Sequence, residues 1–166
     1  MSRRQAKSIG LAIIGAGRVG LFRGEVAARH PAVQWIGIAE KNHNRGLYVA
    51  EKIGADFVTQ DHRELLKRPE VTCAIIATDE HLHVEPILAA VERGVPMLIE
   101  KPLATDLGES ARVLKAITDA RGGLDERIFM RADKKADYGT VARVMGQLSG
   151  AGFKRLALVT EVEQGS

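Results

Sequence analysis

A glycine-rich segment near the start of the chain is the first group of residues whose spacing suggests a chemical role. It fits the pattern G-x-G-x-x-G and consists of Gly15, Ala16, Gly17, Arg18, Val19 and Gly20. Between a strand and a helix, the first glycine permits a tight turn and the second lets the backbone approach a pyrophosphate, while the third allows close helix packing. Unpaired N–H groups at the helix start would then face the phosphates. A glycine-rich turn that binds nothing is the alternative interpretation.

An acidic residue follows this segment at the distance that a dinucleotide site requires. Glu40 comes 20 residues after Gly20, at the end of the next predicted strand, where its carboxylate can accept hydrogen bonds from the hydroxyl groups of an adenosine ribose. A carboxylate here repels a 2′-phosphate and so favours NAD. Lys41 and Arg45 follow closely enough to neutralise such a phosphate, so NADP stays open as a cofactor.

Two polar clusters follow later apolar runs. The first comprises Ala77, Thr78, Asp79, Glu80, His81, Leu82 and His83, and the second comprises Glu100, Lys101 and Pro102. Ligands of open α/β sheets bind beyond the carboxyl ends of the strands, so both clusters are candidates to contact a cofactor. The Lys101 ammonium could stabilise a developing alkoxide and exchange its proton; a solvated lysine paired with Glu100 is the alternative. Because His81 and His83 have no further cysteine or histidine at ligand spacing, no metal site is predicted.

The elements that must position these residues are strands alternating with helices. The expected strands cover residues 9–14, 33–39, 56–59, 72–78 and 96–99, and the expected helices cover residues 18–30, 45–53, 62–67, 83–93 and 106–121. The strands are apolar along their length, which is typical of a parallel sheet covered by helices on both faces. The sequence therefore predicts an α/β fold with a doubly wound, mainly parallel, Rossmann-like sheet.

The last part of the chain follows two glycines, Gly122 and Gly123, which are the best candidates for a domain boundary. Residues 127–131 and 155–160 are expected strands, and residues 138–148 an expected helix. We therefore predict a dinucleotide-binding domain over residues 1–123. A strand–helix–strand extension over residues 124–166 is expected to pack on the same sheet and to extend it.

The composition excludes several classes of protein. The chain has 166 residues, a net charge of +3, 45% hydrophobic residues and 27% charged residues, which is typical of a soluble globular protein. With 4% aromatic residues and no basic patch, a nucleic-acid partner is not predicted. No stretch approaches the roughly 18 apolar residues that span a bilayer, so a cytoplasmic protein without a membrane partner is expected. The single cysteine, Cys73, is expected to be a buried thiol.

Residues 8–121 resemble the N-terminal domain of the glucose–fructose oxidoreductase/inositol dehydrogenase (Gfo/Idh/MocA) family. The resemblance rests on residues 13–20, residues 77–83, residues 89–94 and residues 100–104. It implies a nicotinamide-dependent oxidoreductase of sugars, cyclitols or related polyols, a possible homo-oligomer, and a place for Lys101 beside the nicotinamide and the substrate. Thr78-Asp79-Glu80 departs from the usual Thr-Pro-Asn of the family.

The length limits what this resemblance can imply about activity. A dinucleotide-binding domain takes about 120–150 residues, so a chain of 166 residues leaves little for the second domain that supplies substrate contacts in the family. We therefore expect a cofactor-binding domain truncated before its substrate domain. The substrate, and whether the chain turns over, stay open.

Residues 125–161 resemble a different family, the C-terminal part of the ExbD/TolR biopolymer-transport proteins. The resemblance rests on residues 127–134, 137–139, 144–145, 151–152 and 156–160. A chimera, a fusion and a chance similarity are the explanations that the residues allow. A non-catalytic scaffold or protein-interaction module is accordingly the alternative function.

Overall fold

The structure is a computed structural model, and it describes residues 8–120, 127–131, 138–150 and 154–159. The chain divides into two compact units, Met1–Ile117 and Thr118–Ser166, and we describe each by itself. The predicted boundary at Gly122 and Gly123 lies outside the described residues. The division into residues 1–123 and 124–166 therefore stays a prediction.

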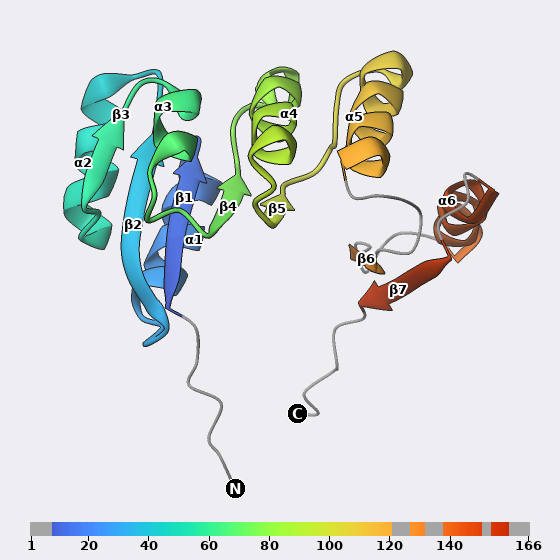
Figure 1. The fold of residues 1–166 in the computed structure, drawn as a ribbon, viewed down its shortest axis with the longest axis horizontal. Coiled ribbons are helices and arrows are strands. Elements are labelled where there is room, and N and C mark those ends of the chain that lie inside the picture. Colours follow the sequence, from blue (N-terminus) through green and yellow to red (C-terminus); the bar gives the residue numbers. More distant parts are fainter. Residues whose placement is uncertain (1–7, 121–126, 132–137, 151–153, 160–166) are drawn as a thin grey trace, which may run out of the picture. The chain divides into compact units, whose positions relative to one another are not determined.

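The first unit is built on five parallel strands in the order β3-β2-β1-β4-β5 (Figure 1). The strands are β1 (Ile9–Ile14), β2 (Val33–Ala39), β3 (Phe57–Thr59), β4 (Cys73–Ile76) and β5 (Met97–Ile99). In the middle of the sheet, Ile13 of β1 lies between Ile38 of β2 and Ile75 of β4. The chain thus builds outward from β1 in both directions, which places a topological switch point at the carboxyl ends of β1 and β4. The predicted α/β, doubly wound parallel sheet is confirmed.

Helices cover both faces of this sheet. They are α1 (Arg18–Ala28), α2 (His43–Ile53), α3 (His62–Lys67), α4 (Val84–Arg93) and α5 (Leu107–Ala120), with a 3₁₀ turn, η1 (Glu80–Leu82), ahead of α4. Helix α2 begins before the expected residue 45 because the Asn42 side chain accepts a hydrogen bond from the Arg45 N–H and caps the helix. Helices α2 and α4 end at Gly54 and Gly94, which adopt the left-handed conformation that glycine tolerates.

Each face of the sheet has its own apolar core. Leu11 and Ile13 of β1 belong to a cluster that includes residues of α2, whereas Ala12 and Ile14 belong to a second cluster that includes residues of α3, α4 and α5. Successive strand residues point to opposite faces, so one strand supplies both cores. Because the sheet is packed from both sides, the loops that follow its strands start from a rigid base.

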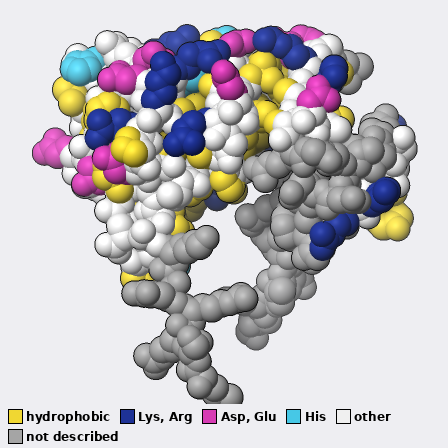
Figure 2. Space-filling view, in the orientation of Figure 1, with side chains coloured by type: hydrophobic (Ala, Val, Ile, Leu, Met, Phe, Trp, Pro, Cys, Tyr) yellow, Lys and Arg dark blue, Asp and Glu magenta, His cyan; other side chains and the backbone are white. Residues whose placement is uncertain are grey.

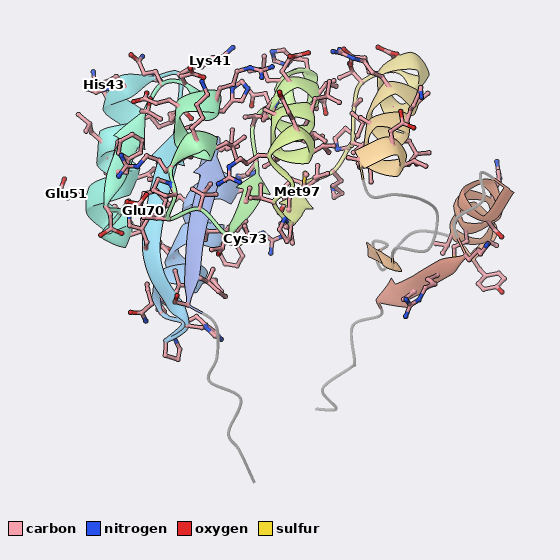
Figure 3. The ribbon with its side chains drawn as sticks, viewed as in Figure 1. Lys41, His43, Glu51, Glu70, Cys73 and Met97 are labelled. Atoms are coloured by element: carbon pink, nitrogen blue, oxygen red, sulfur yellow. The ribbon has the colours of Figure 1, made fainter. Side chains whose placement is uncertain are left out.

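The two ends of the strands in this sheet carry different side chains. Figure 3 shows Lys41 and His43 at the edge where the strands end, and Glu70 and Cys73 at the opposite edge, where β4 begins. In Figure 2, charged side chains of both signs gather along the first of these edges. Cys73, expected to be buried, is only partly buried because it is the first residue of its strand. Burial still raises the pKa of its thiol, so the thiol stays protonated at neutral pH.

The second unit is a strand–helix–strand unit: β6 (Arg127–Arg131), α6 (Tyr138–Gly150) and β7 (Arg155–Val159). Strands β6 and β7 pair with each other in parallel and form a two-stranded sheet of their own. The two strands satisfy ladder hydrogen bonds with each other, and the expectation that this unit packs on the five-stranded sheet and extends it stays a prediction. No helix in the described ranges is long and apolar enough to cross a membrane.

Candidate functional site

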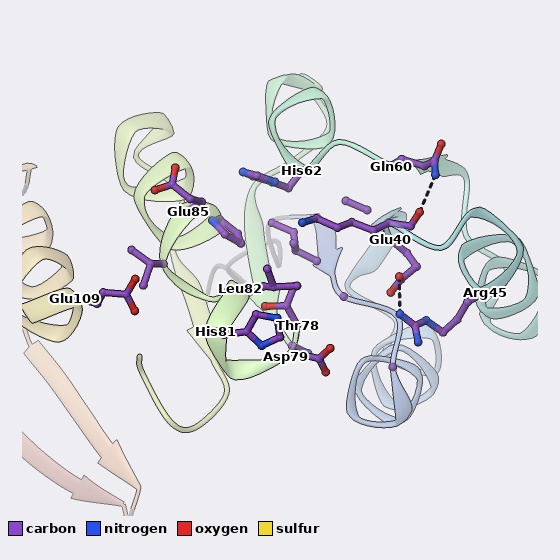
Figure 4. Close-up of a pocket in the computed structure, with 18 residues that line it drawn as sticks. Glu40, Arg45, Gln60, His62, Thr78, Asp79, His81, Leu82, Glu85 and Glu109 are labelled. Carbon is purple, nitrogen blue, oxygen red and sulfur yellow. Dashed lines mark hydrogen bonds and ion pairs between the residues drawn. The ribbon is translucent and has the colours of Figure 1, made fainter. Parts of the chain in front are cut away.

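A cavity of about 350 Å³ opens at the carboxyl ends of the strands in the first unit (Figure 4). Its lining comes mainly from the loops after four strands: Gly15 and Gly17 after β1, Glu40 and Lys41 after β2, Gln60 and His62 after β3, and Ala77, Thr78 and Asp79 after β4. Arg45 of α2 and the first residues of α4 add to the wall. The cavity thus lies at the switch point, where open α/β sheets bind their ligands.

The glycines of the first loop have three different surroundings. Gly15 has a φ of +94°, and a Cβ on it would lie 2.6 Å from backbone atoms of Ala77 and Thr78. A Cβ on Gly20 would lie 2.0 Å from the carbonyl oxygen of Gly15, so helix α1 packs directly on the loop. A Cβ on Gly17 would meet nothing within 4 Å. The first and third glycines are needed for packing, whereas the second leaves open space at the cavity wall.

Helix α1 begins at this open space without a side-chain cap. Its N-cap residue, Gly17, has an extended backbone, and no acidic side chain lies in the first turn. The N–H groups of the first turn and the helix dipole therefore present positive potential that no side chain of the turn offsets. Because Gly17 lines the cavity, this end of the helix is suited to an anionic ligand group.

Glu40 is a buried carboxylate at the cavity, with a fractional exposure of 5%. Its Oε2 accepts a hydrogen bond from the Ala16 N–H at 2.8 Å, and its Oε1 accepts from the Asn42 N–H at 2.9 Å. Oε1 also accepts from Nη2 of Arg45 at 2.7 Å. Burial raises the pKa of Glu40, but the bond from Arg45 and the two backbone bonds outweigh it and hold the pKa below its ordinary value. Glu40 is therefore charged at neutral pH.

Arg45 interacts with the charges of two carboxylates, Glu40 and Asp79. Its hydrogen bond and charge interaction with Glu40 raise the pKa of the guanidinium, and the charge of Asp79 raises it further. Its side chain is about half exposed, at 51%. Figure 4 shows the Arg45 guanidinium directed at the Glu40 carboxylate. Beside this pair, Gln60 donates from Nε2 to the backbone carbonyl of Lys41 at 2.7 Å, which joins the loop after β3 to the loop after β2.

Two buried polar atoms at the cavity have no hydrogen-bond partner among the described residues. They are Nε2 of His62 and Oγ1 of Thr78, and both residues line the cavity. Burial lowers the pKa of His62, so its imidazole is neutral at pH 7. A buried polar atom without a partner is costly. The cavity is therefore suited to a ligand that carries hydrogen-bonding groups to both atoms.

Comparison with known proteins identifies the family. Residues 9–122 match the GFO_IDH_MocA family model, described as an oxidoreductase family with an NAD-binding Rossmann fold. The chain belongs to the Gfo/Idh/MocA oxidoreductase family. The match covers the first unit and its cavity. It ends at residue 122, so the resemblance of residues 125–161 to ExbD/TolR proteins, and a chimeric origin, stay predictions.

Two relatives of the chain have named activities. Levoglucosan dehydrogenase of Pseudarthrobacter phenanthrenivorans is 31% identical over 121 residues, which cover 68% of this chain and 31% of that protein. Inositol 2-dehydrogenase 4 of Saccharopolyspora erythraea is 30% identical over 132 residues, covering 79% of this chain and 38% of that protein. The chain thus spans only 31% and 38% of the length of these two relatives.

Solved structures also match the chain. Levoglucosan dehydrogenase in complex with NADH and levoglucosan matches with a TM-score of 0.62 at 30% identity, over 69% of this chain and 33% of that one. KijD10, a 3-ketoreductase from Actinomadura kijaniata solved with NADP, matches with a TM-score of 0.60 at 28% identity, over 71% and 37% of the two chains.

The structure brings together only part of the predicted cofactor site of this Gfo/Idh/MocA chain. Six of the predicted residues line the cavity, namely Gly15, Gly17, Glu40, Lys41, Ala77 and Thr78. Ala16 contributes its N–H to Glu40, while Arg18 and Val19 are exposed and Gly20 is buried. The predictions did not include Gln60 and His62. They follow β3, whose carboxyl end reaches the same edge, and that placement is the signal that could have identified them.

His83, predicted to contact the cofactor, lies outside the cavity lining. It is 1% exposed, with Nδ1 at 2.6 Å from the Pro102 carbonyl oxygen and Nε2 at 3.0 Å from the Thr78 carbonyl oxygen. Both partners are acceptors, so the ring nitrogen that carries the proton donates to its carbonyl oxygen. His83 therefore joins the loop after β4 to the loop after β5.

Glu100 and Lys101 of the Gfo/Idh/MocA motif also lie outside the cavity lining. Glu100 accepts from Arg23 of α1, with Oε1 at 2.7 Å from Nε and 2.6 Å from Nη2; the choice between a catalytic and a solvated Lys101 stays open. The Glu100 N–H donates to the Ile76 carbonyl at 3.0 Å, which fixes the start of the loop. Lys101 is exposed, and its place beside the nicotinamide stays a prediction.

Proposed function

We propose that this chain binds NAD in the cavity at the strand ends, as the cofactor-binding domain of an oxidoreductase. The observation that carries the proposal is the buried, charged Glu40, held by the Ala16 N–H next to the open space at Gly17. A dinucleotide presents ribose hydroxyls to such a carboxylate and a pyrophosphate to such a helix start. NADP is the second cofactor that the residues allow.

Other residues of the cavity support the same ligand. The orphaned Nε2 of His62 and Oγ1 of Thr78 can bond to the nitrogen and oxygen atoms that a nucleotide carries along its length. The uncapped start of α1 complements two negative phosphates. These groups come from the loops after β1, β3 and β4, so one extended polar ligand would contact all of them.

The substrate class rests on the relatives. Levoglucosan dehydrogenase and inositol 2-dehydrogenase are named for a sugar derivative and a cyclitol, and we propose a sugar, cyclitol or related polyol for the oxidoreductase to which this domain belongs. When bound, the nicotinamide would supply the acceptor for a hydride from a carbinol carbon. Lys101, exposed on the loop after β5, would hydrogen-bond to the reacting hydroxyl and exchange its proton.

Calorimetric titration of NAD⁺ into the full chain tests the proposal. We expect saturable binding by the parent protein and a loss of about tenfold or more with Gly17→Val, whose side chain would fill the space next to the helix start. Gly146→Val is the matched control, because a Cβ at Gly146 also meets nothing within 4 Å and this residue belongs to α6 of the second unit. Absence of binding at millimolar NAD⁺, or equal binding by Gly17→Val, would overturn the assignment.

A further inference from the structure

We propose that Arg23 is a positioning residue for Lys101, and that through Glu100 it ties the place of Lys101 to the helix at which the cofactor binds. The inference rests on the proposed function, in which α1 holds the pyrophosphate of a nicotinamide dinucleotide and Lys101 meets the reacting hydroxyl. Arg23 itself lies outside the glycine loop and outside the cavity lining, so its part in the reaction is indirect.

Arg23 and Glu100 form a partly buried ion pair. Oε1 of Glu100 lies 2.7 Å from Nε of Arg23 and 2.6 Å from Nη2. The two side chains are 32% and 21% exposed, so water and salt screen this pair less than an ion pair on the open surface. The Glu100 N–H also donates to the Ile76 carbonyl oxygen of β4 at 3.0 Å. The first residue of the loop after β5 is therefore fixed to both the sheet and α1.

Arg23 lies near the end of α1 that begins at the cavity. It comes five residues after Arg18, the first residue of the helix, which places it about 8 Å along the axis from the helix start. Helix α1 packs closely on the glycine loop, because a Cβ on Gly20 would lie 2.0 Å from the Gly15 carbonyl oxygen. Glu100 is thus bound to the same rigid helix whose first turn would hold the phosphates.

The other neighbour of Lys101 is held by a second contact. Nδ1 of His83 lies 2.6 Å from the Pro102 carbonyl oxygen, and Nε2 lies 3.0 Å from the Thr78 carbonyl oxygen. Thr78 lines the cavity. Lys101 therefore stands between two residues that are each fixed to an element of the cavity wall, although its own side chain is outside the lining. Its backbone cannot move without breaking one of these contacts.

Arg23 also keeps the nearest carboxylate from pairing with Lys101. The Lys101 side chain is exposed and makes no hydrogen bond or ion pair with the described residues. Glu100 is its neighbour in sequence, and a carboxylate at such short range favours the charged form of an amine. Because Glu100 is engaged by Arg23, Lys101 stays available for a substrate hydroxyl. Loss of Arg23 should free the loop and give Lys101 a competing partner.

The test measures how fast N-hydroxysuccinimidyl acetate acetylates each lysine of the full chain at one mildly alkaline pH, by peptide mass mapping. Without cofactor, Arg23→Met should slow the acetylation of Lys101 about twofold or more, because the released carboxylate favours the charged, unreactive amine. Arg23→Lys should restore the rate, and so should Glu100→Gln added to Arg23→Met. Lys52, exposed on α2, should react equally in all variants.

The same measurement with saturating NAD⁺ tests the link to the cofactor. In the parent, NAD⁺ should slow the acetylation of Lys101 about threefold or more, because a bound ligand covers the surface beside it. In Arg23→Met, the NAD⁺ affinity measured by calorimetry should stay within about threefold of the parent value, whereas this protection should be largely lost. Glu100→Gln, which keeps the size of the side chain and weakens the pair, should lose the protection as well.

Arg29→Met is the control, because it removes a positive charge from the far end of the same helix and should behave as the parent. Equal acetylation of Lys101 without NAD⁺, or equal protection with it, in the parent and Arg23→Met would overturn this inference and leave the proposed function standing. So would a loss of NAD⁺ affinity of about tenfold in Arg23→Met, since Arg23 would then support the cofactor site itself. Failure of NAD⁺ to bind the parent would overturn the proposed function, and the rates without cofactor would still decide whether Arg23 positions Lys101.

Discussion

The backbone N–H of Ala16 donates a 2.8 Å hydrogen bond to Oε2 of Glu40, which lies 24 residues later in the chain. The bond joins the glycine loop after β1 to the carboxylate after β2. Because Glu40 is buried and charged, the bond is charge-assisted and stronger than a neutral one. The glycine loop and the carboxylate are therefore joined directly by this bond.

The two glycines of the loop should respond to substitution in opposite ways. Gly15→Ala should lower the free energy of unfolding by about 1–3 kcal/mol or more, because the residue has a positive φ and its Cβ would meet the backbone of Ala77 and Thr78. Gly17→Val should change the free energy of unfolding by less than about 1 kcal/mol while weakening NAD⁺ binding about tenfold or more. Denaturant unfolding and calorimetry on both variants measure the contrast. Equal destabilisation by the two substitutions would contradict the different surroundings of the two glycines.

Glu40 should make stability depend on pH in a defined direction. Its pKa in the folded protein lies below the ordinary value of 4.5, so the folded state favours the charged carboxylate. This contribution to the free energy of unfolding is present above pH 4.5 and is lost as the pH falls through the lower, folded pKa. Unfolding by denaturant between pH 7 and pH 3 should show a shallower decline for Glu40→Gln than for the parent.

Glu51→Gln serves as the control for this pH experiment, because Glu51 is an exposed carboxylate of α2. Its pH dependence should follow that of the parent. If Glu40→Gln and the parent declined in parallel, Glu40 would not be a carboxylate stabilised by the fold.

His83 should contribute to stability rather than directly to cofactor affinity. His83→Ala removes a buried imidazole whose nitrogens lie within hydrogen-bond distance of the Thr78 and Pro102 carbonyl oxygens, and we expect a loss of about 2 kcal/mol or more in the free energy of unfolding. His43→Ala, which removes an exposed imidazole at the start of α2, should change it by less than about 0.5 kcal/mol. Thermal unfolding of both variants and of the parent protein measures these changes in the free energy of unfolding. A His83→Ala protein as stable as the parent would contradict the bridging role.

The side chain of Lys101 should not be needed for cofactor binding. Its side chain is exposed and lies outside the cavity lining, so Lys101→Ala should change NAD⁺ affinity by less than about threefold, a small fraction of what loss of a charged hydrogen bond costs. Calorimetric titration measures this. A tenfold loss of NAD⁺ affinity would show that Lys101 binds the cofactor directly.

Local signals were sufficient to predict the fold of the first unit. Apolar runs such as Ile9–Ile14 are strands because they are buried along their length, and the spacing of Gly15, Gly20 and Glu40 predicted which loops meet. Arg45 was also expected at the ribose site of Glu40, since it follows Glu40 by only five positions, at the start of the next helix. In each case the partners are near in sequence or belong to a motif with a known geometry.

Contacts between distant residues with ordinary side chains could not be predicted in this way. Arg23 and Glu100 are 77 residues apart, and nothing in either residue's surroundings in the sequence selects the other. His83 looked like a site residue because it follows a strand, and only packing shows that both its nitrogens are used by backbone carbonyls. The pairing of β6 with β7 is likewise a contact between distant residues that no local motif specifies.

The most direct test of the central claim is a ¹⁵N–¹H NMR titration of the full chain with NAD⁺, which reports where a ligand contacts the backbone. We expect the amide signals of Gly15 to Gly20, of Glu40 to Asn42 and of Thr78 to shift in a saturable manner, whereas the signal of Arg29 at the far end of α1 stays in place. Shifts confined to other residues, or no shifts at millimolar NAD⁺, would contradict it.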